Sequence, residues 1–343
     1  MPTRRTVRSA TAFCAFASLL LFQPKTAIGE SCTATSTIEL RFGVYPGNTF
    51  TFGKYVGLEG SNDRDPLDDV ALDTMVELSS GKPFDVHLYA QWDRGAAGLA
   101  AQISRIDARG LRLNVALKYV PPAGRDGDHA GFAQWVAETV ASHPDVDVWQ
   151  ITNEANVPGS PDTDGSAKDP IGALIAGVKA AASATDAEVG FNWFYRLDPV
   201  TDRLFWSDLG ARGGDEFRAA IDYAGVDIYA GTYIPPLYSI DDEADFRTAL
   251  EYVRCEMMPL AGLGATVPIY VQEFGYPTLA PLRTEEKQAE ALRAYLRAAQ
   301  GLNVGLLQWF QLADATSDLG DGWGLVRADY SRKPAFHVFR DGE

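Results

Sequence analysis

The sequence is poor in the side chains that build most metal and thiol active sites. Its 343 residues include four histidines and three cysteines. Metal-dependent hydrolases need clustered histidines and carboxylates, and these histidines show no paired spacing. No cysteine has a histidine beside it that could activate it. We therefore expect no metal site, no catalytic cysteine and no cofactor. The histidines are His87, His129, His143 and His337.

Glycine-rich phosphate-binding turns are also missing. A doubly wound nucleotide-binding sheet would carry one after its first strand. A phosphate-binding barrel would carry one after its seventh or eighth strand, where this chain has Phe274-Gly275-Tyr276-Pro277. Neither class of phosphate-binding protein fits the sequence.

Basic residues are outnumbered by acidic ones. The chain has 30 Lys and Arg against 46 Asp and Glu, a formal net charge of −16. Such a surface repels nucleic acid and anionic lipid. We expect no nucleic-acid partner, and a polyanionic substrate is disfavoured.

Long apolar runs are absent after residue 30. Before it, Arg4, Arg5 and Arg8 precede an apolar run at 12–22, and small residues end at Gly29. This order is typical of a secretory signal peptide, and the run is too short to span a bilayer comfortably. We predict a signal peptide over 1–29 and a mature domain over 30–343, outside the cell or in the periplasm and not held in a membrane. A permanent N-terminal anchor is the alternative.

The cysteines leave one question open. Cys14 would depart with the signal peptide, so Cys32 and Cys255 would remain in an oxidising compartment. A disulfide between them is one interpretation, and two unpaired thiols are another, because sequence spacing cannot place them.

What the chain does contain is a regular alternation of strand and helix signals. Apolar helical spacing fills most gaps between the strands, and Asp169 and Thr284 are expected helix N-caps. Eight strands alternating with helices predict an α/β fold, a single-domain (β/α)8 TIM barrel. The expected strands are 38–45, 84–92, 111–120, 146–153, 188–194, 223–229, 268–273 and 304–311.

Two of these strands end on glutamate. The fourth ends on Asn153-Glu154 and the seventh on Glu273. A buried strand rarely ends on a carboxylate unless it faces a cleft or a partner. Barrel chemistry occurs at the C-terminal ends of the strands, where strands four and seven lie nearly opposite. Either glutamate alone could be a solvated strand-end residue, but together they predict a pair of catalytic carboxyl groups.

These segments resemble the clan A retaining glycoside hydrolases, a superfamily of (β/α)8 enzymes. The resemblance covers about residues 38–340 and is specific for the clan rather than for one family. It implies hydrolysis of O-glycosidic bonds, β-linked in our interpretation, in a poly- or oligosaccharide, by double displacement. The matching motifs are Asn153-Glu154, Glu273-Phe274-Gly275-Tyr276-Pro277, Trp309 with Asp314 after it, Gly324-Leu325 and Lys333-Pro334-Ala335-Phe336.

The resemblance also implies roles for individual residues. Glu154 would be the general acid/base and Glu273 the nucleophile. Asn153 would bind the 2-hydroxyl of the sugar, and Tyr229 would donate a hydrogen bond to the nucleophile. Trp309 would form the hydrophobic floor beneath the sugar at the cleavage point.

The chain departs from the clan at two positions. Many members have an arginine on strand two near the nucleophile, where this chain offers only the late Arg94, and His87 reads as a core residue. Many also have a histidine two residues before the strand-six tyrosine, where this chain has Asp227. Period-two alternation places Asp227 and Tyr229 on one face, so we expect Asp227 to line the pocket, tuning a pKa or binding a hydroxyl.

Two further tryptophans are candidate sugar contacts. Trp92 ends strand two and Trp193 lies near the end of strand five. Either could instead pack its loop onto the barrel. A non-catalytic carbohydrate-binding barrel and a transglycosylase with the same residues remain the alternative functions, and the paired glutamates argue against a pure binding protein.

Overall fold

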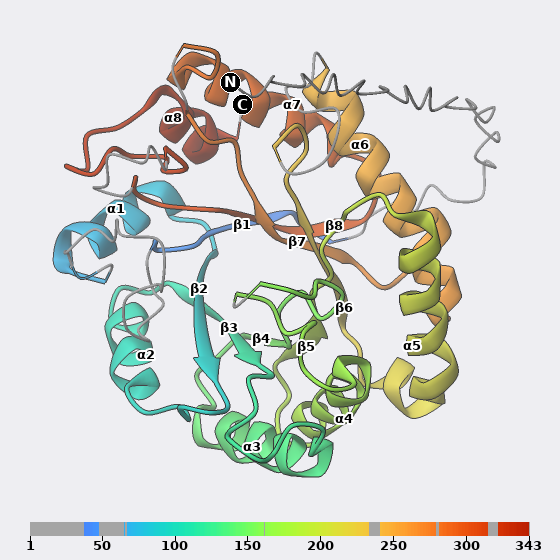
Figure 1. The fold of residues 1–343 in the computed structure, drawn as a ribbon. Coiled ribbons are helices and arrows are strands. Elements are labelled where there is room, and N and C mark those ends of the chain that lie inside the picture. The colour runs from blue at the N-terminus through green and yellow to red at the C-terminus, as the bar shows by residue number, and fades with distance from the viewer. Residues whose placement is uncertain are drawn as a thin grey trace, which may run out of the picture.

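The computed structural model describes residues 38–47, 65, 67–160, 162–232, 241–278, 281–314 and 322–342. The expected signal peptide and Cys32 lie outside these ranges. Within them the strands form one closed parallel barrel in the order β1 to β8, which confirms the predicted fold (Figure 1). The strands are β1 (Arg41–Val44), β2 (Phe84–Gln91), β3 (Arg112–Lys118), β4 (Val148–Ile151), β5 (Glu188–Phe191), β6 (Tyr223–Ile228), β7 (Ile269–Phe274) and β8 (Val304–Trp309).

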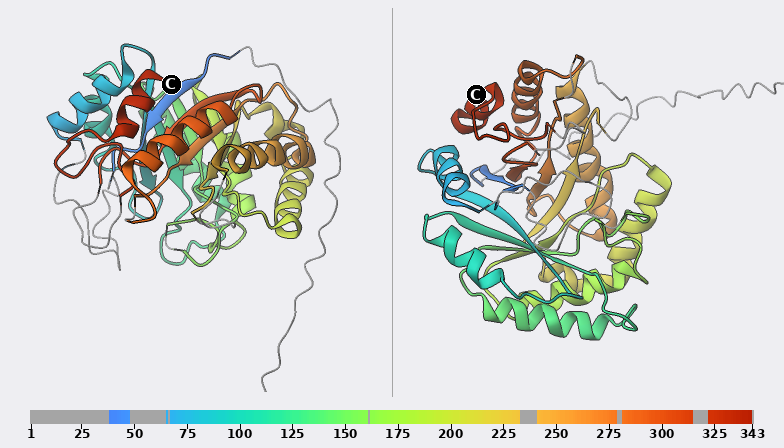
Figure 2. Two further views of the ribbon diagram at one scale, coloured as in Figure 1. Left: turned by 90° about the horizontal axis from the view of Figure 1, so that it is seen from above. Right: turned by 60° about the vertical axis from the view of Figure 1, so that its left-hand side comes forward.

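Helices surround the barrel, as the two turned views show (Figure 2). No helix among the described residues is both long and apolar enough to cross a membrane. The helices are α1 (Asp69–Ser79), α2 (Leu99–Asp107), α3 (His129–Ser142), α4 (Pro170–Ala182), α5 (Pro199–Ala219), α6 (Asp242–Tyr252), α7 (Glu285–Ala298) and α8 (Pro334–Asp341), with the short turns η2 (Val253–Met257) and η3 (Met258–Ala261) after α6.

Local chemistry sets where helices begin. The Asp169 side chain accepts a hydrogen bond from Gly172 N, and Pro170 opens α4. The Thr284 side chain accepts one from Lys287 N at the start of α7. A side-chain oxygen at the cap satisfies a backbone N–H that has no partner within the helix. Both caps agree with the sequence-based prediction.

Strand alternation divides side chains between the barrel interior and the helix layer. On β8, Gln308 hydrogen-bonds inside the barrel to Asn114 and His87, whereas the next residue, Trp309, packs on Phe339 of α8. Successive side chains of a strand point to opposite faces. This parity decides which residue of each strand end reaches the mouth of the barrel.

Strand β7 breaks the alternation at one point. Asp227 of β6 pairs with Glu273, although Val226 pairs with Val271, so the register shifts by one residue. A bulge inserts one extra residue and re-aims the side chains that follow it. Gln272 hydrogen-bonds to Asn114 inside the barrel, and Glu273, the next residue, bonds to Tyr89 of β2 and Tyr229 after β6, so both side chains point inward.

Glycine at position 225 lets β5 and β6 approach closely beside this bulge. A Cβ at Gly225 would collide with the carbonyl oxygen of Phe191 and lie 3.1 Å from Asn192 Cα. We predict that Gly225→Ala lowers the free energy of unfolding by about 1–3 kcal/mol, because overpacking displaces the β5 backbone. Urea denaturation tests this. Gly264→Ala is the matched control, since its nearest atom is 3.8 Å away; equal effects of both substitutions would contradict the argument.

Candidate active site

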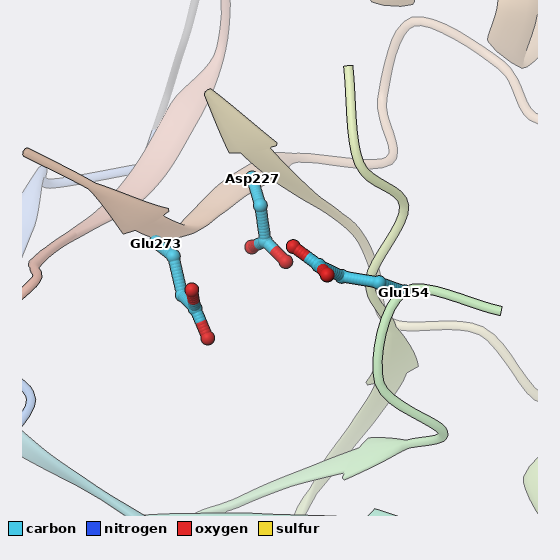
Figure 3. Close-up of side chains that lie close together, drawn as sticks. All are labelled: Glu154, Asp227 and Glu273. Carbon is cyan, nitrogen blue, oxygen red and sulfur yellow. The ribbon is translucent and has the colours of Figure 1, made fainter. Parts of the chain in front are cut away.

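Three carboxyl groups converge at the C-terminal end of the barrel. Glu154 follows β4, Asp227 lies on β6 and Glu273 on β7. One carboxylate oxygen of each residue lies within 4.8 Å of one from both others. Figure 3 shows Asp227 between the two glutamates, with its carboxyl group turned toward that of Glu154. The paired glutamates of the sequence are therefore close together in space, joined by the aspartate.

Glu273 is held by two phenol groups. Tyr89 Oη donates to Glu273 Oε1 at 2.5 Å, and Tyr229 Oη donates to Oε2 at 2.7 Å. Burial raises the pKa of Glu273, while both tyrosine hydrogen bonds lower it. Donors to both oxygens favour the ionised form. Glu273 is the member of the trio built to carry a negative charge.

Glu154 sits beyond the end of β4 in a left-handed backbone conformation, with φ of 48°. Its backbone N–H donates to Asn192 Oδ1 at 2.7 Å. Burial first, and then the charge of Glu273, raises the pKa of Glu154 well above its ordinary value. Glu154 is therefore set to hold a proton beside an ionised Glu273.

Asn192 ties the acidic residues together. Its Nδ2 donates to Asn153 Oδ1 at 3.0 Å and to Asp227 Oδ2 at 2.5 Å. Because its Oδ1 accepts from Glu154 N, the orientation of the amide is defined. Burial first, and then the charges of Glu273 and Glu154, raises the pKa of Asp227 well above its ordinary value.

A buried lysine supplies positive charge to this region. Lys118 at the end of β3 is fully buried, donates to the backbone oxygen of Asp162, and lies 5.7 Å from the ring centre of Tyr89. Its charge lowers the pKa of Glu154, Glu273 and Asp164. Arg94, the arginine expected near strand two, pairs instead with Asp93 at 3.9 Å in the turn after β2.

Asp164 anchors the backbone at the site. Its Oδ2 accepts from Tyr119 N and from Asn153 N, both at 2.7 Å. Burial raises the pKa of Asp164 to about 6. The side chain of Asn153 donates from Nδ2 to Asp162 O at 2.9 Å and accepts at Oδ1 from Tyr89 Oη at 3.3 Å. The two strand ends that carry Lys118 and Glu154 are thereby linked.

The structure corrects the three tryptophan expectations. Trp309 and Trp193 are fully buried and Trp92 is 5% exposed. Trp309 packs edge-on against Phe274 at 5.1 Å between centroids, and Trp193 packs on Trp206 of α5 at 5.7 Å. Trp92 stacks on Tyr119 at 5.9 Å and contacts Phe132 of α3. All three lie in the layer between strands and helices, so they have almost no surface to offer a sugar.

Phe310 occupies the position that we had expected of Trp309. It contacts Tyr45 at 4.9 Å between ring centroids, Trp323 at 5.8 Å and Tyr229 at 6.3 Å. Since Trp309 points outward, its neighbour Phe310 points inward. This aromatic group lies beside Glu273, because Tyr229 contacts Phe310 and also donates a hydrogen bond to Glu273.

Several functional candidates were missed in the sequence. Tyr89, Lys118 and Asn192 all belong to predicted strands, and each lies on the inward face. Lys118 had a usable signal, because a lysine within an apolar strand is costly to bury without partners. For Tyr89 and Asn192 the only available signal was strand alternation, which places them on the inward face near the strand ends. His87, in contrast, is the core residue that we expected, buried with Nδ1 3.0 Å from Gln308 Oε1 and a pKa lowered by burial to about 4.

The trio is also the group among the described residues with the spacing to hold a metal ion. Its surroundings favour proton chemistry instead. Both Glu273 oxygens already accept from tyrosines, and Asp227 Oδ2 accepts from Asn192. Cys255 is half-buried in η2, and its pairing with Cys32 stays a prediction.

No family model matches the sequence, and no curated protein matches it. The fold does match solved structures. A GH5_18 structure from Streptomyces cattleya in complex with GlcNAc has a TM-score of 0.57 at 21% identity, covering 90% of this chain and 80% of that chain. A family 1 β-glucosidase from Thermotoga maritima has a TM-score of 0.58 at 13% identity, covering 90% and 97%. Xylanase 10B from the same organism has a TM-score of 0.58 at 14% identity, covering 89% and 94%. The chain shares the barrel fold of these glycoside hydrolases.

The electrostatics of Glu154 predict a pH-dependent stability change. Its pKa is higher in the folded than in the unfolded chain, so ionisation penalises the folded state. That penalty is absent below the unfolded pKa of about 4.3. It grows as the pH rises toward the folded pKa and is constant above it. We therefore expect Glu154→Gln to raise the melting temperature at pH 8 and to raise it less, or not at all, at pH 4.

Differential scanning calorimetry at both pH values measures this effect. Each tenfold difference in the ionisation constant between the folded and unfolded chains corresponds to about 1.4 kcal/mol. Glu138→Gln, at an exposed position of α3, is the matched control and should change neither value. An equal gain at pH 4 and pH 8 for Glu154→Gln would point to packing and not to charge.

Proposed function

We propose that the protein is a secreted retaining glycoside hydrolase that cleaves β-linked O-glycosidic bonds in a poly- or oligosaccharide. The observation that carries the proposal is the Glu154–Glu273 pair, with one oxygen of each within 4.8 Å of the other. Retaining glycosidases place their two carboxyl groups about 5–5.5 Å apart, whereas inverting enzymes leave about 6.5–9.5 Å for a water molecule. The spacing supports the retaining mechanism.

In the first half-reaction Glu273 acts as the nucleophile. One of its oxygens forms a bond to the anomeric carbon while the bond from that carbon to the leaving oxygen breaks. Glu154 delivers its proton to the leaving oxygen, so the departing group leaves as a neutral alcohol. The tyrosine donors favour the ionised nucleophile, and burial beside Glu273 favours the protonated acid.

In the second half-reaction water replaces the glutamate. Glu154, now ionised, accepts a proton from the water as its oxygen attacks the anomeric carbon. The bond from that carbon to Glu273 breaks, and its electron pair returns to the carboxylate. Both residues regain their starting protonation states, and two inversions leave the anomeric configuration retained.

The environment of the pair favours a neutral sugar. Tyr229, Phe310, Tyr45 and Trp323 form an aromatic group beside Glu273, and aromatic faces suit the apolar faces of sugar rings. Asn153 lies next to the acid/base and remains our candidate for the 2-hydroxyl contact. The fold neighbours include a β-glucosidase and a xylanase, which supports the β-linkage in this proposal.

Secretion rests on the N-terminal sequence. Three arginines precede the apolar run at 12–22, and small residues end at Gly29. This arrangement supports export and removal of residues 1–29. The disulfide between Cys32 and Cys255 would form in the same oxidising environment.

The proposed function predicts distinct roles for the two glutamates. A panel of aryl β-glycosides and polysaccharides should reveal turnover by the wild-type protein and a loss of about 10³-fold or more in Glu273→Ala, which has no nucleophile. With an aryl glycoside and added azide, Glu154→Ala should yield a β-glycosyl azide and Glu273→Ala an α-glycosyl azide. NMR spectroscopy of the products distinguishes the two anomers.

Asp202→Asn is the matched control for substitution of a buried acid, since Asp202 is 1% exposed and lies on α5. It should retain activity. Turnover unchanged in either glutamate variant would remove that residue from the mechanism. Sugar binding without turnover by the wild type would favour the binding-barrel alternative, and sugar acceptors outcompeting water would favour a transglycosylase.

A second prediction concerns the hydrogen bond from Tyr229. Tyr229→Phe removes a donor that lowers the pKa of Glu273, so that pKa should rise. The acidic limb of the pH profile of kcat/KM should then move upward by about one pH unit, as expected for a charge-assisted hydrogen bond of about 1.5 kcal/mol. Tyr89→Phe removes the other donor and should move the limb in the same direction. A uniform loss of activity with an unmoved limb would assign these tyrosines to packing alone.

A further inference from the structure

Asp227 is the part of the trio that a two-carboxylate mechanism leaves without a role. It is fully buried, whereas Glu154 and Glu273 are each 9% exposed. A residue with no exposed surface cannot contact a sugar in this conformation. The expectation that Asp227 binds a hydroxyl is thereby disfavoured, and its action has to pass through a neighbour.

The hydrogen bonds of Asp227 distinguish its two oxygens. Oδ2 accepts from Asn192 Nδ2 at 2.5 Å. Oδ1 is buried and has no hydrogen-bond partner of normal geometry among the described residues, although the Glu273 backbone N–H also lowers the pKa of Asp227. Since an oxygen that already accepts a strong hydrogen bond is the poorer place for a proton, a proton on Asp227 belongs on Oδ1. A buried carboxylate oxygen left without a donor would be costly.

Oδ1 has a partner if one proton is shared. One carboxyl oxygen of Asp227 lies within 4.8 Å of one of Glu154, and Figure 3 shows their carboxyl groups facing. Two facing carboxylates repel when both are ionised and bond strongly when one is protonated. A shared proton would give Asp227 Oδ1 a hydrogen-bond partner and would also remove the repulsion between the two carboxylates.

We propose that Asp227 and Glu154 hold one proton between their facing carboxyl groups, and that Asp227 thereby sets the upper pH limit at which Glu154 serves as the general acid. The catalytic half of this statement rests on the proposed glycosidase function. The proton sharing does not, because it follows from burial and geometry alone. Asp227 is in this account a positioning residue, since it acts through Glu154.

Charged and titratable groups from every neighbouring element take part in this balance. They contribute one buried positive charge and several groups that are negative or neutral. They are Glu273 of β7, Lys118 of β3, Tyr89 of β2, Tyr229 after β6, and Asp162 and Asp164 in the loop after β4. Lys118 is the group in this set that opposes the accumulation of negative charge.

The net charge of the trio stays constant during the proposed reaction. Before bond cleavage Glu273 carries one negative charge and the Asp227–Glu154 pair carries another. After Glu154 has given the proton to the leaving oxygen, Glu273 is a neutral ester and the pair carries both charges. Water then returns a proton to the pair as the ester bond breaks. The buried site therefore never has to accommodate an additional charge, which a region of low polarity would oppose.

The test is the variant Asp227→Asn, with Asp202→Asn as the control for a buried acid elsewhere. In carboxyl-labelled wild-type protein, ¹³C NMR spectroscopy should show Glu154 and Asp227 titrating together in two steps. In Asp227→Asn, Glu154 should titrate in one step, with its midpoint at least about one pH unit below the upper step of the wild type. The basic limb of the kcat/KM profile should move down equally, and Asp202→Asn should move neither.

The outcomes separate the possible failures. Independent titration of Glu154 at an unchanged midpoint in Asp227→Asn would overturn the proposal, and so would a raised KM with an unmoved basic limb, which marks a sugar contact. If the two residues titrate as a pair but the protein turns over no glycoside, the proposal of a shared proton stands and the proposed glycosidase function is rejected. If Asp227→Asn does not fold, Glu154→Gln gives the reciprocal test, since the midpoint of Asp227 must then fall.

Discussion

Burying three carboxyl groups within a few ångströms is the constraint on which the rest of this site depends. Each would lose hydration free energy on entering the barrel mouth, and each repels the others when ionised. The structure meets this cost differently at each residue. Glu273 receives two phenol donors and Asp227 an amide donor, whereas the Glu154 carboxyl faces Asp227, with which we propose that it shares a proton. The difference in donors favours a negative charge on Glu273 and a proton on Glu154, which are the states that the proposed mechanism requires.

The barrel produces this arrangement because alternate side chains of each strand point inward, with one irregularity in β7. Inward-facing positions on β2, β3 and β6 and just after β5 supply Tyr89, Lys118, Asp227 and Asn192 at one level. Glu273 reaches the same level only because β7 shifts register beside Asp227. A bulge at this point adds an inward side chain without lengthening the strand. Deeper in the barrel, Gln272 and Gln308 both bind Asn114, so the site rests on a hydrogen-bonded layer that holds the strand ends in place.

The limits of sequence-based prediction follow from the same geometry. Periodicity was enough to find eight strands, and strand-end position was enough to find Glu154 and Glu273, because these signals are local. The prediction that Trp309 faces the site was wrong by one position. The location of a strand end does not define which of two adjacent aromatic side chains points inward. The bulge in β7 has no local signature in a run as uniform as Ile269–Phe274. Tyr89 and Asn192 matter through partners more than 30 residues away, and pairings of that kind appear only in the folded chain.

Donation to Glu273 by two neutral phenol groups, with no arginine hydrogen-bonded to it among the described residues, has a consequence for the proposed mechanism. An arginine bound to the nucleophile would oppose the loss of its charge when the glycosyl ester forms, because the cation prefers a carboxylate to an ester. Phenol donors favour the carboxylate too, but they are neutral and leave no unpaired cation once the ester has formed. Lys118 donates to the Asp162 carbonyl, and its charge lowers the pKa of Glu154 and Glu273. In the proposed mechanism, the charge that Glu273 gives up on forming the ester therefore appears on the Glu154–Asp227 pair, which loses its proton to the leaving oxygen.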